Sequence, residues 1–172
     1  MSADDHRAGM VASVRVAVLT VSDTRTAEND HSGTTILRML TGAGHVWGAY
    51  EIVHDEPEAV RRFIFDAHKK GNVDAVLING GTGLAARDTT VEAVSALFEK
   101  HIDGFGELFR MLSFAEIGAN AMLSRAAAGT CGSMAIFCLP GSTPAVTLAM
   151  EKLILPTLPH LVSLLRPGNV RK

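Results

Sequence analysis

Residues 74–90 read DAVLINGGTGLAARDTT, and this stretch decides the fold class of the chain. An apolar run with no charge after Asp74 stops at Asn79, and three glycines follow within four residues. Such an uninterrupted apolar run is typical of a strand that is buried on both faces of a mainly parallel sheet. The segment therefore predicts a strand, a glycine loop and then a helix, which Thr89 or Thr90 can cap.

The same order of strand and helix recurs along the chain. Three more strands are expected at 14–21, 50–53 and 134–140, where aliphatic runs end in turn residues. Apolar residues at helical spacing follow them, and they predict helices that begin near residues 32, 57, 90, 105 and 142. Pro156 and Pro159 are expected to break the chain after the last helix. Strands that alternate with helices in this way indicate an α/β fold, with helices on both faces of the sheet.

The length and composition fit one domain with a buried core, because the chain has 172 residues and 47% of them are hydrophobic. We expect this domain at 14–166, between tails at 1–13 and 167–172, since no linker or repeat divides the sequence. A net charge of −2 without runs of like charge argues against a nucleic-acid surface. The apolar stretch 153–165 contains two prolines and is too short for a membrane span, and the N-terminus lacks a secretory signal. These features predict a cytoplasmic protein without membrane or nucleic-acid partners.

Residues that directly follow the expected strands are the candidates for a site, because ligands of open α/β sheets bind beyond the carboxyl ends of the strands. These residues are mostly small, hydroxyl-bearing or acidic. They are Ser22 to Arg25, His54 to Glu56, Asn79 to Gly83, and Pro140 to Thr143. This composition predicts a binding site at one edge of the sheet.

The glycine loop differs from both common glycine motifs. A dinucleotide fingerprint has its glycines on the first strand-to-helix turn, and residues 20–27 contain none. A P-loop needs a lysine and a hydroxyl residue after its last glycine, and GGTGLAAR has neither. Backbone N–H groups after a strand can still form an anion-binding concavity. We interpret the segment as a phosphate-binding loop, with a plain turn as the alternative. Its residues are Gly80, Gly81, Thr82, Gly83 and Arg87.

Two aspartates near strand ends each allow two interpretations. Asp88 precedes a helix, where an aspartate commonly caps the helix or interacts with its dipole. It can also hold Mg²⁺ beside a phosphate together with Asp55, because magnesium takes one or two carboxylates plus phosphate oxygens. The pattern alone leaves both interpretations open.

Two further segments are ambiguous. Residues 113–129, SFAEIGANAMLSRAAAG, are interpreted from composition as a helix with packed alanines and a surface arginine. The segment 139–145, LPGSTPA, can hold a phosphate or nucleotide where a helix starts, and a simple turn explains it almost as well. The residues by themselves thus predict an α/β domain with a site for a phosphorylated ligand and magnesium, and they do not name a reaction.

Five motifs in order resemble the molybdenum cofactor biosynthesis family that includes MoaB and MogA: SDTRTAENDHSG, HDEPE, NGGTGLAARDTTVEA, GFGELFRMLSFAEIGANAMLSRAAAG and LPGST. The resemblance covers about residues 13–165, and GFGELFRMLSFAEIG is closer to the MoaB branch. It implies a three-layer α/β/α domain that binds molybdopterin. In active members of the family, this domain transfers AMP from ATP to the terminal phosphate of the pterin.

The resemblance also implies roles for individual residues. The family's two functional aspartates match Asp55 and Asp88, which are therefore expected to be catalytic and to bind magnesium. The serine of a Ser-Arg pair implicated in pterin binding matches Ser124, with Arg125 beside it. The residues expected to bind substrate or nucleotide are Gly80, Gly81, Thr82, Gly83, Arg87, Ser124, Arg125, Pro140, Gly141, Ser142, Ser22 and Asp23.

The expected function is that of a molybdopterin adenylyltransferase, which uses Mg²⁺ and ATP as substrate and carries no tightly bound cofactor. Some MoaB-branch members have lost the aspartate at position 55, so its retention here favours the enzyme over a non-catalytic molybdopterin-binding or carrier protein. The missing fingerprint disfavours a nicotinamide-dependent oxidoreductase. The resemblance further implies a homotrimer or homohexamer, and contact with other cofactor-biosynthesis proteins.

Overall fold

The computed structural model describes residues 11–166 of the chain. The expected tails at 1–13 and 167–172 lie outside the described residues, apart from residues 11–13. Two short helical turns, η1 (Gly118–Leu123, 3-10) and η2 (Met150–Ile154, π), interrupt the regular elements. The others are β1 (Arg15–Val21), α1 (His31–Gly42), β2 (Val46–Val53), α2 (Pro57–Lys70), β3 (Ala75–Asn79), α3 (Thr90–Ser95), β4 (Lys100–His101), α4 (Asp103–Ile117), β5 (Ala127–Cys131), β6 (Met134–Leu139), α5 (Thr143–Ala149) and α6 (Leu155–Leu165).

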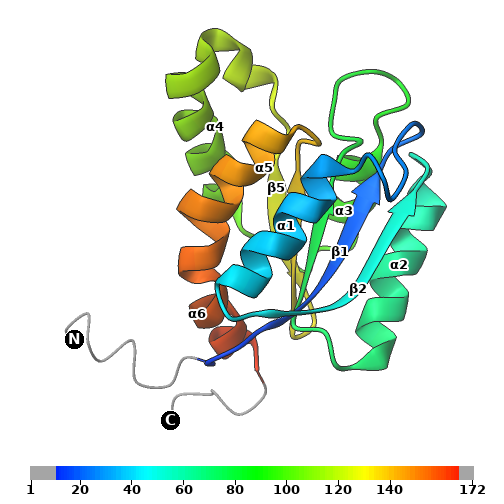
Figure 1. Ribbon diagram of the computed structural model, residues 1–172, viewed down its shortest axis with the longest axis vertical. Helices are drawn as coiled ribbons and strands as arrows, with labels where there is room; N and C mark the ends of the chain where they lie inside the picture. Colours follow the sequence, from blue (N-terminus) through cyan, green and yellow to red (C-terminus); the bar gives the residue numbers. More distant parts are fainter. Residues whose placement is uncertain (1–10, 167–172) are drawn as a thin grey trace.

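A six-stranded sheet in the order β2-β1-β3-β6-β5-β4 forms the centre of the fold. The strands β2, β1, β3 and β6 are parallel, whereas β5 is antiparallel to β6 and β4 is antiparallel to β5. Helices α2 and α3 cover one face of the sheet, and α1, α4, α5 and α6 cover the other (Figure 1). The prediction of a three-layer α/β/α fold with a mainly parallel sheet is confirmed.

Strand β3 contributes to both hydrophobic cores, as the charge-free sequence at 74–79 predicts. All five of its residues are buried. Ala75 and Leu77 pack among α1, α4, α5 and α6, while Val76 and Ile78 pack among the residues of α2 and α3. Because alternate side chains of a strand point to opposite faces, a strand covered on both faces is apolar throughout.

The interpretation of residues 113–129 as one helix is wrong. Helix α4 ends at Ile117, the turn η1 follows, and residues 127–131 form strand β5, which pairs with β6 in a hairpin. The small residues have a packing reason, since a Cβ atom on Gly129 would lie 2.3 Å from the ring of Phe98. Tertiary packing thus outweighs the helical propensity of the alanines.

The chain also remains helical beyond Pro156, where we expected a break. Pro156 lies in the first turn of α6, a position that tolerates proline, and Pro159 lies inside the helix. Ile154, Leu158 and Val162 are fully buried in the core, so this face holds the helix in place. The continuous helical stretch Thr143–Leu165 has 23 residues. By length and composition alone it could cross a membrane, but the core helices of soluble proteins can be equally long and apolar.

Candidate active site at the carboxyl edge of the sheet

The glycine loop begins where the carboxyl ends of β1, β3 and β6 lie so close together that their backbones are in contact. Gly80 has φ +99°, and a Cβ atom on it would lie 2.1 Å from the carbonyl oxygen of Val21 at the end of β1. Its N–H donates to the carbonyl of Leu139 at the end of β6 (3.0 Å). A Cβ atom on Gly141 would lie 3.0 Å from the Cα of Gly80. Glycine is therefore required at position 80, and a side chain at position 141 would press on it, so the structure brings these two predicted site residues together.

Asp55 lies against this loop from the end of β2. A Cβ atom on Gly81 would come within 2.7 Å of one Asp55 carboxylate oxygen. The other oxygen accepts hydrogen bonds from the N–H and the hydroxyl of Thr89 (3.5 and 3.4 Å). Burial raises the pKa of Asp55, and the charges of Asp88 and Asp23 add to this rise, although the bonds from Thr89 oppose it. A nearby cation would relieve this accumulation of negative charge.

Asp88 closes the far side of the glycine loop and is not the cap of the following helix. Helix α3 begins at Thr90 with Thr89 as its N-cap residue, and no side chain caps it. One carboxylate oxygen of Asp88 instead accepts the N–H of Ala85 (3.1 Å). A Cβ atom on Gly83 would lie 2.5 Å from that oxygen. The structure therefore places Asp88 at the same loop against which Asp55 lies, close enough for its charge to act on Asp55.

Asp23 and Arg87 connect the first strand end to the loop. Asp23 pairs with the guanidinium of Arg87 and accepts from the His54 ring (3.2 Å) and the Asp55 N–H (3.3 Å). Burial would raise the pKa of Asp23, but these hydrogen bonds and charges outweigh it and lower the pKa. Arg87 is 65% exposed at its side chain, so a ligand can reach it from solvent.

The turn after β6 is held by a network of Arg25, from the predicted segment Ser22 to Arg25, with Asp30, Ser32 and Tyr50, which we did not predict as site residues. Arg25 and Ser32 both donate to the carbonyl of Gly141, at 2.7 Å each. Asp30, whose side chain is fully buried, binds Arg25 (3.0 Å) and also accepts from the hydroxyls of Thr20 (2.5 Å) and Tyr50 (2.6 Å). These bonds fix the position of Gly141 relative to β1.

Asp30 carried a signal in the sequence, because it directly precedes the first expected helix. Its side chain accepts from the N–H of Gly33 (3.0 Å) and so caps α1. Tyr50 is part of a strand and nothing in its local pattern marks it. Ser142, in the same turn as Gly141, is exposed, and its hydroxyl caps α5 by accepting from the N–H of Ala145 (3.4 Å).

Ser124 and Arg125 reach the same edge of the sheet because β5 is antiparallel. The amino end of an antiparallel strand lies beside the carboxyl ends of its parallel neighbours. Arg125 donates to the carbonyls of Thr82 (3.0 Å) and Asp88 (2.9 Å) on the glycine loop. Ser124 is half-buried next to it, and its carbonyl accepts from Arg110 (3.4 Å). The structure thus joins the Ser-Arg pair to the glycine loop.

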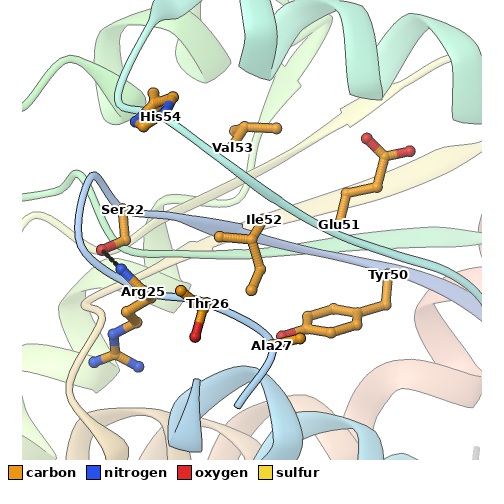
Figure 2. Close-up of a pocket in the computed structure, with 9 residues that line it drawn as sticks. All are labelled: Ser22, Arg25, Thr26, Ala27, Tyr50, Glu51, Ile52, Val53 and His54. Atoms are coloured by element: carbon orange, nitrogen blue, oxygen red, sulfur yellow. Dashed lines mark hydrogen bonds between the residues drawn. The ribbon is translucent and has the colours of Figure 1, made fainter. Parts of the chain in front are cut away.

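An open pocket of about 430 Å³ lies next to this site, between the loop after β1 and strand β2 (Figure 2). Among its lining residues are Ser22, Arg25, Tyr50 and His54, and the close-up shows Ile52 and Tyr50 extending toward the loop 25–27. The glycine loop does not line this pocket. Ser22 is therefore placed in the adjoining pocket, where its hydroxyl accepts the N–H of Arg25 (3.2 Å).

Oxygen atoms at the loop suit a magnesium ion that is also bound by phosphates. Within residues 11–166, no three histidine, cysteine or acidic side chains are grouped closely enough to hold a metal by themselves. Magnesium is usually bound by one or two carboxylates plus substrate phosphates, and Asp55 and Asp88 offer that number. The buried hydroxyl of Thr90 has no hydrogen-bond partner among the described residues and touches the same Gly81 as Asp55. The donor set therefore fits the ion.

Comparison with known proteins gives a consistent result over nearly the whole chain. A family model described as "probable molybdopterin binding domain" matches residues 17–160. Molybdenum cofactor biosynthesis protein B of Bacillus subtilis is 50% identical over 167 residues, which cover 96% of this chain and 98% of the relative. A crystal structure of molybdenum cofactor biosynthesis protein B superposes with a TM-score of 0.85 at 53% identity, covering 87% of this chain and 94% of that one. The tungsten cofactor synthesizing protein MoaB from Pyrococcus furiosus gives 0.83 at 34% identity, covering 91% and 99%.

Proposed function

Because this chain belongs to the molybdopterin-binding-domain family of molybdenum cofactor biosynthesis proteins, in its MoaB group, we propose that it binds molybdopterin and adenylylates it with Mg-ATP. The observation that carries the proposal is that Asp55 and Asp88 both lie against the glycine loop, near Gly81 and Gly83. Both carboxylates lie within contact of loop backbone, where phosphate groups can approach closely. The products are adenylylated molybdopterin and pyrophosphate.

The proposed step is an attack by a terminal phosphate oxygen of molybdopterin on the α-phosphorus of ATP. A P–O bond forms to the pterin phosphate, and the bond to pyrophosphate breaks, so pyrophosphate leaves with the electron pair. Such transfers depend on positioning and on stabilisation of negative charge more than on covalent chemistry by the protein. A site built from backbone N–H groups, a carboxylate pair and Arg87 suits these needs.

The loop from Gly80 to Gly83 is the proposed cradle for phosphate oxygens, through the N–H groups after Gly80, whose own N–H is bonded to the carbonyl of Leu139. Its positive φ values at Gly80 and Gly81 (+99° and +62°) are typical of backbone concavities whose N–H groups bind anions. Asp55 and Asp88 would hold Mg²⁺ beside those phosphates, where the ion offsets their negative charge. Ser124 would contact the pterin part of molybdopterin, because it lies on the segment that precedes the antiparallel strand β5.

The competing proposal is a non-catalytic molybdopterin-binding or carrier protein of the same fold. It requires the fold and the pterin contacts and does not require the carboxylate pair. Asp55 is held by Thr89 and is partly desolvated, an arrangement that costs free energy and serves no evident packing purpose. This observation favours the enzyme.

The decisive experiment incubates the purified protein with molybdopterin and Mg-ATP and measures adenylylated product and pyrophosphate. We expect product formation that depends on Mg²⁺. If molybdopterin binds but no AMP is transferred under conditions where an active homologue works, the carrier proposal replaces the enzyme.

We also propose that the protein assembles as a homotrimer or homohexamer in the cytoplasm. Helix α4 and turn η1 expose large apolar side chains in the isolated chain, including Met111, Phe114 and Met122 at 61%, 63% and 77%. Contiguous apolar surface of this kind commonly marks a protein–protein interface. Light scattering of the purified protein measures the number of subunits, and a monomer would contradict this proposal.

A further inference from the structure

Arg125 was expected to bind a substrate, but its guanidinium group is directed at the protein backbone. Its Nε donates to the carbonyl of Thr82 (3.0 Å), and its Nη2 donates to the carbonyl of Asp88 (2.9 Å). These two carbonyls flank the exposed part of the glycine loop, residues 83–87. One side chain therefore holds both ends of this part of the loop.

Glu92 on α3 holds the other edge of the same guanidinium. Its two carboxylate oxygens accept from Nη1 and Nη2 of Arg125, the latter at 3.3 Å. The hydrogen bond from Arg125 lowers the pKa of Glu92 below its usual value. A guanidinium has five N–H donors, and these contacts use four of them. At most one donor remains, too few for the two-pronged grip by which arginine binds phosphate.

Peptide geometry extends the effect of Arg125 to the other side of the loop backbone. In a planar trans peptide, the C=O and the following N–H point in opposite directions. Arg125 binds the C=O of Asp88, and the N–H of the same peptide, which belongs to Thr89, points away from it to Asp55 (3.5 Å). By the same rule, the bond to the Thr82 carbonyl directs the N–H of Gly83 away from Arg125. Arg125 thus fixes two peptide planes, one of which contacts Asp55.

We propose that Arg125 is a positioning residue, and that Glu92 and Arg125 together form a clamp that orients the peptides after Thr82 and Asp88. The clamp presents the N–H groups of Gly83 and Thr89 on the side of the loop opposite Arg125. It also ties the loop to the Ser124 segment, because Ser124 directly precedes Arg125. The part of this inference that concerns ATP rests on the proposed function, whereas the part that concerns loop geometry does not.

Hydrogen exchange in the full-length protein without ligand tests the clamp directly. The variants are Arg125→Gln, Arg125→Lys and Glu92→Gln, and the control is Arg61→Gln, which removes an arginine paired with Glu58 on α2. We expect amide exchange across residues 82–90 to rise about tenfold in Arg125→Gln, which loses charge-assisted bonds to the backbone. Glu92→Gln should give a rise of about threefold and Arg61→Gln none, with exchange in β3 unchanged throughout.

Affinity for Mg-ATP, measured by calorimetry, separates positioning from direct binding. If Arg125 positions the loop, affinity falls about tenfold in Arg125→Gln, and both Glu92→Gln and Arg125→Lys weaken it about threefold. If Arg125 is a ligand, Arg125→Gln loses affinity while loop exchange stays as in the wild type, and Glu92→Gln changes neither; that result overturns the inference. If the wild type does not bind Mg-ATP, the proposed function fails, and loop exchange alone still decides whether the clamp exists.

Discussion

The carboxyl edge of the sheet and the surface of α4 and η1 differ in whether their side chains find partners within the same chain. At the carboxyl edge, polar groups are held by partners within the chain: Gly141 by Arg25 and Ser32, and the glycine loop by Arg125. The α4–η1 surface, by contrast, presents the apolar side chains of Leu108, Met111, Phe114, Ile117, Met122 and Leu123, all at least 47% exposed.

Helix α4 carries large apolar side chains outside its buried face, beside the charged side chains of Glu107, Arg110 and Glu116. Its inner side chains, such as Phe105 and Phe109, are buried in the core. The contrast agrees with the proposal that a second chain covers the α4–η1 surface, whereas the polar groups of the carboxyl edge are held within one chain. Four predictions test this contrast.

The largest effect is expected from Asp88→Asn, which removes one of the two charges at the loop. The amide can still accept the N–H of Ala85, so the fold and pterin binding should persist. Transfer of AMP should fall about 10²–10³-fold, comparable to the loss of one preorganised electrostatic group. A coupled pyrophosphate assay measures this, with Asp66→Asn on the exposed face of α2 as the matched control. Unchanged turnover would remove Asp88 from the mechanism.

A comparable test of the α4–η1 surface is the double substitution of Phe114→Ser and Met122→Ser. Each side chain is more than 60% exposed in the isolated chain, so the folded subunit should tolerate the change. If a second subunit covers both, the dissociation constant should rise about a hundredfold, or roughly 3 kcal/mol, and sedimentation should show smaller species. Phe65→Ser on α2, where Phe65 is 55% exposed, is the control. If Phe65→Ser weakens association as much as the double substitution does, the α4–η1 surface is not the subunit interface.

A third prediction concerns the rigidity of the carboxyl edge. Gly80→Ala places a Cβ atom at φ +99° and 2.1 Å from a backbone carbonyl, so we expect a loss of about 3 kcal/mol in unfolding free energy. Gly42→Ala at the end of α1 meets nothing within 4 Å and should be neutral or slightly stabilising. Urea unfolding of both variants measures the difference, and similar stabilities would show that the loop can relax.

The smallest effect is expected from pH and the buried Asp30. Burial alone would raise the pKa of Asp30, but hydrogen bonds from Thr20, Tyr50, Gly33 and Arg25 outweigh it and lower the pKa. A lowered folded-state pKa contributes stability above the unfolded pKa that is lost as pH falls through the folded pKa. Tyr50→Phe should cost about 1.5 kcal/mol near neutral pH and less in acid. Equal losses at pH 7 and at a pH below the folded-state pKa of Asp30, located by NMR titration of its carboxyl group, would separate Tyr50 from this titration.

The sequence was informative where one local pattern determined the structure. The apolar run at 74–79 predicted a strand buried on both faces, and the residues after the parallel strands lie at one edge of the sheet. Strand β6 was predicted at 134–140, but its partner β5 was missed, because alanine-rich segments have high helix propensity and the packing of Gly129 against Phe98 is not visible in the sequence. Contacts such as Tyr50 with Asp30 join residues of different elements, and no spacing pattern records them.

Because β5 runs antiparallel to β6, its pairing places the Ser-Arg pair at the carboxyl edge and also sets how far the pair lies from the turn after β6. The β5–β6 hairpin pairs five residues on each strand, from Ala127 with Cys138 to Cys131 with Met134. Arg125 precedes one strand and Pro140 follows the other, so the register of the hairpin sets how far apart they lie. A two-residue slip would keep every side chain on its own face and every core residue apolar. It would nevertheless move the Ser-Arg pair away from the glycine loop. The register of the hairpin therefore determines the distance between the Ser-Arg pair and the loop.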